Sequence, residues 1–167
     1  VLYEESMFDG QKVSKSRIIT SVDYSMVSME AFEIYAANHD IHVMDFVLKL
    51  DAYTYYMMNL LDYLIGNTDR HWGNWGFLVD NRTNQPVRLF DLMDLNQTFL
   101  AYDTPDGANC MTTGNRKMSQ REAAVEAVKK IGLNQRAEIK DEWFEGREKE
   151  REMFWCRFGI LKEQWKA

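Results

Sequence analysis

The polar segment LIGNTDRHWGNWGF, residues 64–77, gathers residue types that carry out acid–base and metal chemistry. Asp69 and Asn74 both lie in it, and two further carboxylates, Asp91 and Asp94, follow a short apolar segment. Phosphoryl transfer requires a carboxylate that accepts a hydroxyl proton and oxygen ligands that hold Mg2+ against the phosphates. These residue types therefore indicate phosphoryl transfer as the chemistry that the segment could support.

The spacing of these residues matches the catalytic loop of protein kinases. Those enzymes place the base Asp and a metal-binding Asn in the pattern D-x-x-x-x-N, and a second metal-binding Asp in a D-F-G turn after a short hairpin. Residues 69–74, DRHWGN, reproduce the first pattern, and DLN at residues 94–96 stands in the place of D-F-G. Asp91 is a rival metal ligand, but the residues after it do not continue the D-F-G pattern.

The segments GNTDRHWGN and LMDLNQTFLAYD together resemble the HipA-like kinases, and more loosely the phosphoinositide kinases with their D-R-H-x-x-N loop. The motifs lie between residues 60 and 103, and the helices expected on either side agree in kind with the helical C-terminal lobe of a kinase. The resemblance implies a Ser/Thr protein kinase that transfers the γ-phosphoryl group of ATP to a protein substrate with Mg2+. It also suggests an antitoxin-like partner, as in a toxin–antitoxin pair.

The resemblance implies a catalytic role for three consecutive residues of the loop. Asp69 would be the general base, because a base must reach the acceptor hydroxyl within hydrogen-bond distance. Arg70 and His71 would shape the loop or contact phosphate. Trp72 and Trp75 are expected to anchor the loop on the core rather than to stack on a nucleobase.

Cofactor and metal binding are likewise implied by the resemblance. Asn74 and Asp94 would be the magnesium ligands, with Asp91 as the alternative to Asp94, since Mg2+ prefers oxygen ligands. Asn67 and Asn74 would be the residues that bind the ATP cofactor. Asn67 has a second expected role, which is to hold the backbone of the loop.

Two elements of a complete kinase have no counterpart in the sequence. It contains no G-x-G-x-x-G loop and no strand lysine of the V-A-I-K type, both of which bind the ATP phosphates in protein kinases. We therefore expect residues 1–167 to form a single domain, a C-terminal kinase lobe that lacks its ATP-covering N-terminal lobe and is inactive alone. Two alternatives stay open: a kinase-derived protein-binding module that has lost its chemistry, and a lipid or small-molecule kinase.

Helical periodicity precedes the polar loop. Apolar residues recur at helical spacing after Ser28, which is a suitable N-cap. Asp40 is expected to cap a second helix, IHVMDFVLKL, and a third, AYTYYMMNLLDYLI, is expected to end at Gly66. The opening of the chain, Val1 to Tyr24, has no sustained period and is expected to be irregular, with at most one short strand.

A β-hairpin is expected after the loop, because WGFLVD and VRLFDLM are apolar and the connector NRTNQP is rich in turn formers. Residues 101–117 are expected to form a long loop. Ser119 and Glu122 form a capping box before a helix that Gly132 ends. Another helix is expected from Arg136 to Phe144. The apolar stripe of a last helix consists of Phe154, Phe158, Leu161 and Trp165.

Composition limits the class of protein further. The net charge of −6 argues against nucleic acid as a main partner, and no segment has the roughly 18 consecutive apolar residues that a membrane span needs. Cys110 and Cys156 have neither disulfide nor zinc-site spacing, which favours a cytoplasmic protein. The expected fold class is α+β, predominantly α-helical, with one small β-hairpin.

Overall fold

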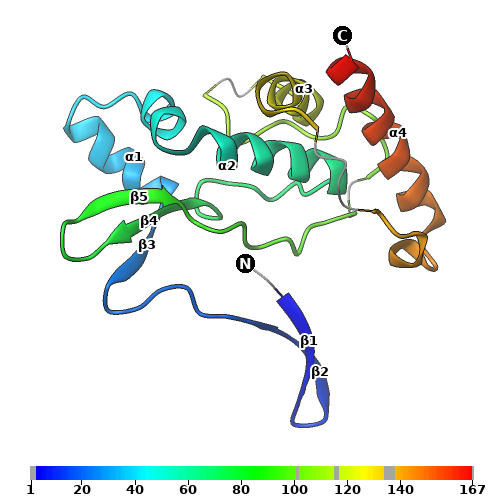
Figure 1. Cartoon of the computed structure of the whole chain (residues 1–167), viewed down its shortest axis with the longest axis horizontal. Helices are drawn as coiled ribbons and strands as arrows, with labels where there is room; N and C mark the ends of the chain where they lie inside the picture. The colour runs from blue at the N-terminus through cyan, green and yellow to red at the C-terminus, as the bar shows by residue number, and fades with distance from the viewer. Residues whose placement is uncertain (1–2, 101, 115–116, 134–137, 167) are drawn as a thin grey trace.

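The computed structural model describes residues 3–100, 102–114, 117–133 and 138–166. Over these residues it contains four α-helices, one short 3-10 helix and two small antiparallel sheets (Figure 1). The elements are β1 (Tyr3–Phe8), β2 (Gln11–Ser16), β3 (Tyr24–Ser28), α1 (Met29–Asn38), α2 (Val43–Ile65), β4 (Gly76–Asp80), β5 (Gln85–Leu89), α3 (Gln120–Ile131), η1 (Asp141–Phe144) and α4 (Glu148–Lys166). The expected α+β class is confirmed.

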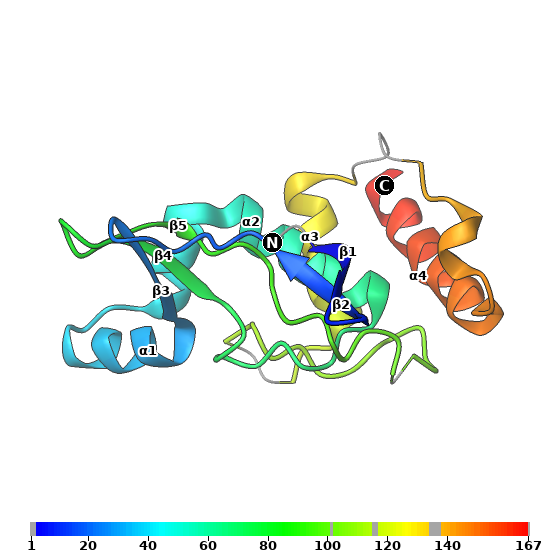
Figure 2. The ribbon, with the colours of Figure 1, turned by 90° about the horizontal axis from the view of Figure 1, so that it is seen from below.

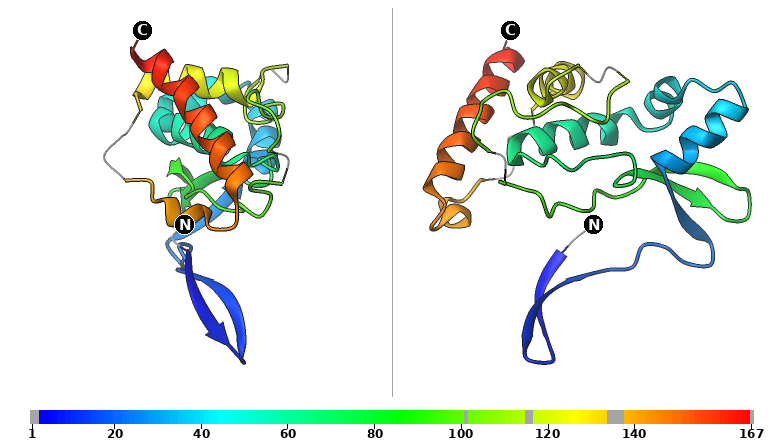
Figure 3. Two further views of the ribbon diagram at one scale, coloured as in Figure 1. Left: turned by 90° about the vertical axis from the view of Figure 1, so that its right-hand side faces the viewer. Right: turned by 180° about the vertical axis from the view of Figure 1, so that it is seen from behind.

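Helix α2 is the central element of the fold. Its first part lies beside β5, and its later turns pack against α3 and α4 (Figures 1 and 3). The two helices expected over this stretch are its two parts, which meet at a kink where Asp51 has φ −155° and ψ 66°. Asp51 Oδ1 accepts a hydrogen bond from Thr54 N and so caps the second part, while its Oδ2 accepts one from Leu89 N in β5.

The start of α2 differs from the expectation. Asp40 does not cap it: the helix begins at Val43 with His42 at the N-cap position, and Asp40 has a left-handed φ of 54°. Asp40 therefore serves the turn after α1, where a short polar side chain tolerates that conformation. The predicted N-cap of α1 is confirmed, because Ser28 accepts a hydrogen bond from Ala31 N.

The expected β-hairpin is confirmed as β4 and β5, and a third strand joins it. β3 pairs antiparallel with β4, so the sheet order is β3-β4-β5. Phe77 of β4 is completely buried and lies opposite Val27 of β3 and Leu89 of β5. The sheet thereby ties the segment before α1 to the strand that follows the polar loop.

The expectation for the opening of the chain was wrong. Residues 3–16 form a second hairpin, β1–β2, which projects away from the helices in Figures 1 and 3 and toward the viewer in Figure 2. Its two-residue turn is Asp9-Gly10, and both residues have positive φ, 48° and 75°. This dipeptide suits a type I′ turn and was the available sequence signal. Only Ser6 and Val13 of the two strands are half-buried, and the other strand residues are exposed. Strands with so little burial need no alternation of apolar and polar residues, so the sequence carries little sign of them.

The C-terminal third agrees with the expectation in part. The capping box of Ser119 and Glu122 is present, and Gly132 ends α3. The helix expected from Arg136 to Phe144 is reduced to the 3-10 turn η1, and residues 134–137 lie outside the described residues. Only Phe144 of η1 is buried, so this segment has too little apolar surface for a longer helix.

The buried residues form a hydrophobic cluster that draws on α1, α2, the three-stranded sheet, α3 and α4. Phe154 and Leu161 of α4 belong to it, Phe158 is half-buried, and Trp165 is 48% exposed, so the predicted stripe of the last helix is buried except at its end. Within the described ranges, no helix combines the length and the apolar content that crossing a membrane requires.

We predict that β1 and β2 exchange their backbone amide hydrogens far faster than β4. An isolated two-stranded hairpin is marginally stable in water, and the strands of this one contact chiefly each other. Hydrogen exchange followed by NMR or mass spectrometry measures both strands in one sample. Equal protection of the hairpin and of β4 would contradict the prediction.

Candidate functional site

The polar loop, residues 67–75, lies between two glycines that allow close backbone approaches. Gly66 ends α2 with a left-handed φ of 63°, and a Cβ there would overlap the ring of Tyr102. A Cβ on Gly76 would overlap the carbonyl oxygen of Val27 in β3. Larger residues at these two positions would push the loop away from the segments that hold it.

Arg70 connects the loop to α2 through a buried ion pair. Its Nε donates to Asp62 Oδ2 over 2.8 Å, and its Nη2 donates to Asp62 Oδ1 over 3.0 Å. Both residues are only 3% exposed. Two parallel hydrogen bonds between a guanidinium and a carboxylate fix orientation as well as distance. The loop is therefore held rigidly against the last turns of α2.

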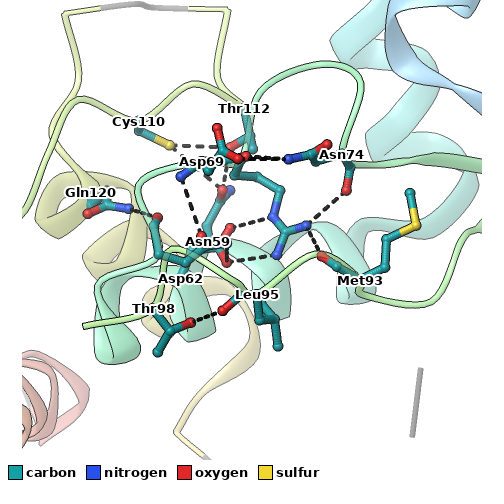
Figure 4. Close-up of polar contacts among 12 residues, drawn as sticks. Asn59, Asp62, Asp69, Asn74, Met93, Leu95, Thr98, Cys110, Thr112 and Gln120 are labelled. Atoms are coloured by element: carbon teal, nitrogen blue, oxygen red, sulfur yellow. Dashed lines mark hydrogen bonds and ion pairs between the residues drawn. The ribbon is translucent and has the colours of Figure 1, made fainter. Parts of the chain in front are cut away.

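The third nitrogen of Arg70 joins the two sequence motifs. Nη1 donates to the carbonyl oxygen of Asn74 over 2.9 Å and to that of Met93 over 2.6 Å (Figure 4). The end of the D-x-x-x-x-N loop and the start of the D-L-N turn thus share one donor atom. The structure thereby brings the backbone at Asn74 close to the backbone at Met93, the residue before Asp94.

Asn74 holds Asp69 in place from within the loop. Its Nδ2 donates to the carbonyl oxygen of Asp69 over 2.7 Å and lies 3.5 Å from Asp69 Oδ2. Because a carbonyl oxygen only accepts hydrogen bonds, this contact identifies the amide nitrogen and leaves Oδ1 as the oxygen that could bind a metal. Asn74 is 7% exposed, whereas the Asp69 side chain is 39% exposed. The carboxylate is therefore the accessible group of the pair.

His71 stands beside Asp69 at the open side of the loop. Its Nδ1 accepts a hydrogen bond from Gly73 N over 3.0 Å, so the neutral ring carries its hydrogen on Nε2. Nε2 lies 4.0 Å from Asp69 Oδ1. Neutral His71 could accept a proton only at Nδ1, and it would then lose its hydrogen bond from Gly73 N.

Asn67 lies completely buried at the start of the loop. Its Nδ2 donates to Asp62 Oδ1 over 3.0 Å, and its Oδ1 accepts from Asp69 N over 3.4 Å. Its carbonyl oxygen accepts a hydrogen bond of 2.6 Å from Gln120 at the start of α3. These contacts favour the second of its two expected roles, which is to hold the loop backbone.

The two candidate metal carboxylates have different surroundings. Asp91 Oδ1 accepts a hydrogen bond of 2.6 Å from Arg88 Nη1, within an ion pair. Asp94 has a left-handed φ of 54°, an uncommon backbone conformation of the kind that gathers at functional sites. Asp40 shares this conformation in an ordinary turn, so the choice of Asp94 over Asp91 as the ligand stays a prediction.

The magnesium ion that the sequence predicts at this loop stays a prediction. In the described part of the chain, no group of three or more His, Cys, Asp and Glu side chains could hold a metal ion. Asn74 and Asp94 offer one amide oxygen and one carboxylate. Mg2+ commonly takes few protein oxygens and completes its shell with water and substrate phosphates.

Sequence reasoning missed the polar residues on α2 that support the loop. Asp62 pairs with Arg70, and Asn59, three residues earlier, accepts hydrogen bonds from Thr112 Oγ1 and from Cys110 Sγ. Both residues lie beside the loop in Figure 4, and each is 3% exposed. The available signal was two polar residues, three positions apart, inside an otherwise apolar helix.

The tryptophans anchor the loop as expected. Trp75 is 4% exposed within the core, and Trp72 Nε1 donates to the carbonyl oxygen of Met111 over 2.9 Å. Met111 belongs to the 102–114 segment, the described part of the loop expected at residues 101–117. That segment therefore contacts the polar loop at Trp72.

We predict strong energetic coupling between Asp62 and Arg70. Replacing Arg70 with Met leaves a buried carboxylate without its cation, and replacing Asp62 with Asn leaves a buried cation, so each should lower the free energy of unfolding by about 3–5 kcal/mol. The double variant D62N/R70M leaves neither charge and should lose much less than the sum of the two. Urea unfolding of all four proteins measures the coupling, and additive losses would contradict it.

A second prediction concerns the backbone at Asp94. Asn tolerates the left-handed conformation, so Asp94→Asn should change the free energy of unfolding by no more than about 0.5 kcal/mol, whereas Asp94→Ala should lower it by about 1–2 kcal/mol. Asn96→Ala is the matched control, because Asn96 is exposed and has no positive φ. Equal stability of the Asp94→Asn and Asp94→Ala variants in urea unfolding would argue against a conformational requirement.

Comparisons of the chain with protein-family models, with curated proteins and with solved structures found no match.

Proposed function

We propose that this chain is the C-terminal lobe of a HipA-like Ser/Thr protein kinase, which transfers the γ-phosphoryl group of ATP to a protein hydroxyl with Mg2+. The observation that carries the proposal is the position of Arg70 Nη1 between the carbonyl oxygens of Asn74 and Met93. Two motifs that are separate in sequence, D-x-x-x-x-N and D-L-N, are thereby held at one place, which phosphoryl transfer requires of a base and its metal ligands.

Each loop residue has a role that follows from its contacts. Asp69, with its partly exposed carboxylate, accepts the proton of the acceptor hydroxyl. Asn74 Oδ1 and the Asp94 carboxylate would bind the metal. Mg2+ would supply charge neutralisation for the phosphates when it is bound. Arg70 contacts no substrate in this scheme, because its donors are directed at Asp62 and at the two backbone carbonyls.

His71 is the residue through which a substrate could meet the loop. Its side chain is 54% exposed. In the neutral ring Nε2 is a hydrogen-bond donor, and it lies 4.0 Å from Asp69 Oδ1. A donor at this position suits a phosphate oxygen or the acceptor group itself. His71 thus orients substrate next to the base rather than accepting the proton.

The phosphate-covering parts of a kinase are a separate requirement. Neither a glycine-rich loop nor a V-A-I-K lysine occurs in the sequence, so the proposal assigns the covering of ATP to a lobe beyond these 167 residues. The activity is accordingly proposed for the complete protein, and the chain itself supplies the base and the metal ligands.

The decisive experiment measures Mg2+-dependent transfer of label from γ-labelled ATP, to protein or to water, by the complete protein that carries this chain. Asp69→Asn should lower the rate by roughly 10²–10⁴-fold, the range expected for a lost general base, and should leave nucleotide binding nearly intact. Asp94→Asn should raise the Mg2+ concentration needed for half-maximal rate. Asp91→Asn is the matched control and should keep both properties.

Each result decides one assignment. Substantial turnover by the Asp69→Asn variant would exclude Asp69 as the base. A raised Mg2+ requirement in the Asp91→Asn variant, with normal behaviour of the Asp94→Asn variant, would move the ligand to Asp91. A wild-type protein that neither binds MgATP nor transfers phosphate would contradict the kinase proposal and support a binding module that has lost its chemistry.

A further inference from the structure

Arg157 of α4 is a completely buried cation. Its two hydrogen bonds within the described residues go to backbone carbonyls rather than to a carboxylate: Nη1 donates to Tyr63 O over 2.5 Å, and Nη2 to Thr104 O over 2.7 Å. Its Nε has no hydrogen-bond partner among the described residues. The guanidinium also lies between two aromatic rings, 5.0 Å from the ring centroid of Tyr63 and 4.3 Å from that of Tyr102.

Such a residue is an unusual choice for a helix that only needs to pack. Burial lowers the pKa of the Arg157 guanidinium below its ordinary value, because desolvation penalises the charged form. A methionine or leucine would fill the space without that penalty. Packing alone therefore does not account for Arg157. The reason for its burial has to lie in the segments that its hydrogen bonds connect.

The contacts of Arg157 hold the end of α2, from which the polar loop departs. Near the end of an α-helix the carbonyls have no partner within the helix. Here the C-cap Gly66 N donates to Asp62 O and Tyr63 O, and each of the last four carbonyls also has a partner from outside the helix: Asp62 O accepts from Asn67 N, Tyr63 O from Arg157 Nη1, Leu64 O from the Tyr102 hydroxyl and Ile65 O from Phe99 N. A cation at this end also suits the negative pole of the helix dipole.

The same guanidinium contacts the segment that follows the D-L-N turn. Thr104 accepts its second hydrogen bond, and Tyr102, which lies under it, is bound to Leu64. The end of α2 and the 102–104 segment therefore meet on Arg157, and the ribbon shows this end of α2 directed at α4 (Figures 1 and 3). One side chain of α4 thus contacts the two segments that lead into and away from the site.

We propose that Arg157 is a positioning residue that couples α4 to the catalytic loop. It sets the direction in which the loop leaves α2, and it holds the 102–104 segment in register with that loop. α4 is then a part of the site, and moving it changes the loop. The importance of this coupling for catalysis rests on the proposed function, but its existence can be tested without any assay of phosphoryl transfer.

The test uses tryptophan and backbone amide signals in 1H–15N NMR spectra of the full chain. Trp72 Nε1 and Asn74 N report on the loop, through their hydrogen bonds to Met111 O and His71 O. Trp155 reports on α4, and the amides of β4 report on global unfolding. In Arg157→Met we expect the two loop signals to shift and to exchange with solvent about tenfold faster, with β4 unchanged.

Two further variants complete the design. Arg157→Lys keeps the charge and can reach one carbonyl, so it should restore the loop signals in part. Lys162→Met removes a cation from the exposed face of α4 and should leave the loop signals as in the wild type. In the complete protein, Arg157→Met should lower kcat and leave KM for ATP unchanged.

The outcomes separate the coupling from the kinase proposal. Unchanged loop signals in Arg157→Met, with a shifted Trp155, would overturn the coupling and leave Arg157 a residue of the α4 interface only. If Arg157→Met does not fold, Arg157→Gln, which removes the cation but keeps a polar side chain, decides by the same signals, and an unperturbed loop in that variant overturns the coupling equally. Loosened loop signals in a protein that transfers no phosphate would support the coupling while removing the kinase assignment.

Discussion

The buried ion pair between Arg70 and Asp62 is the interaction on which the site depends. Each donor of a guanidinium that is left unmet out of water carries a desolvation penalty, so partners for its nitrogens are strongly favoured. The carboxylate of Asp62 satisfies two of its nitrogens, and the third is satisfied by the carbonyls of Asn74 and Met93. The need to satisfy one buried cation therefore determines where the loop and the D-L-N turn meet.

The site has a rigid back and an accessible front. At the back, Asn67 and Arg70 are buried against Asp62, and Gln120 from α3 holds the first residue of the loop. At the front, the carboxylate of Asp69 and the ring of His71 are partly exposed. Phosphoryl transfer gains chiefly from positioning and electrostatics, so a site of this form suits it better than one built on a mobile loop.

Polar groups inside α2 give the helix two tasks. Its apolar residues form the centre of the core, while Asn59 and Asp62 form hydrogen bonds with the 102–114 segment and with the loop. The end of the helix is bound by groups from the 99–104 segment and from α4. Helix α2 consequently transmits the position of α4 and of the 102–104 segment to the site, and it does so through hydrogen bonds rather than through apolar contacts alone.

The sequence by itself determined the features that depend on neighbours a few residues apart. The N-cap at Ser28, the capping box at Ser119, the end of α2 at Gly66 and the spacing from Asp69 to Asn74 are all local, because each joins groups within about one or two helical turns. The Asp9-Gly10 turn was equally local but lacked the apolar alternation that marks a half-buried strand. Only the tertiary structure decided that Asp62 pairs with Arg70, that Asp94 is left-handed beside the loop, and that Arg157 lies at the end of α2. These contacts join segments that approach only when the core packs, and no short pattern of residues encodes such an approach.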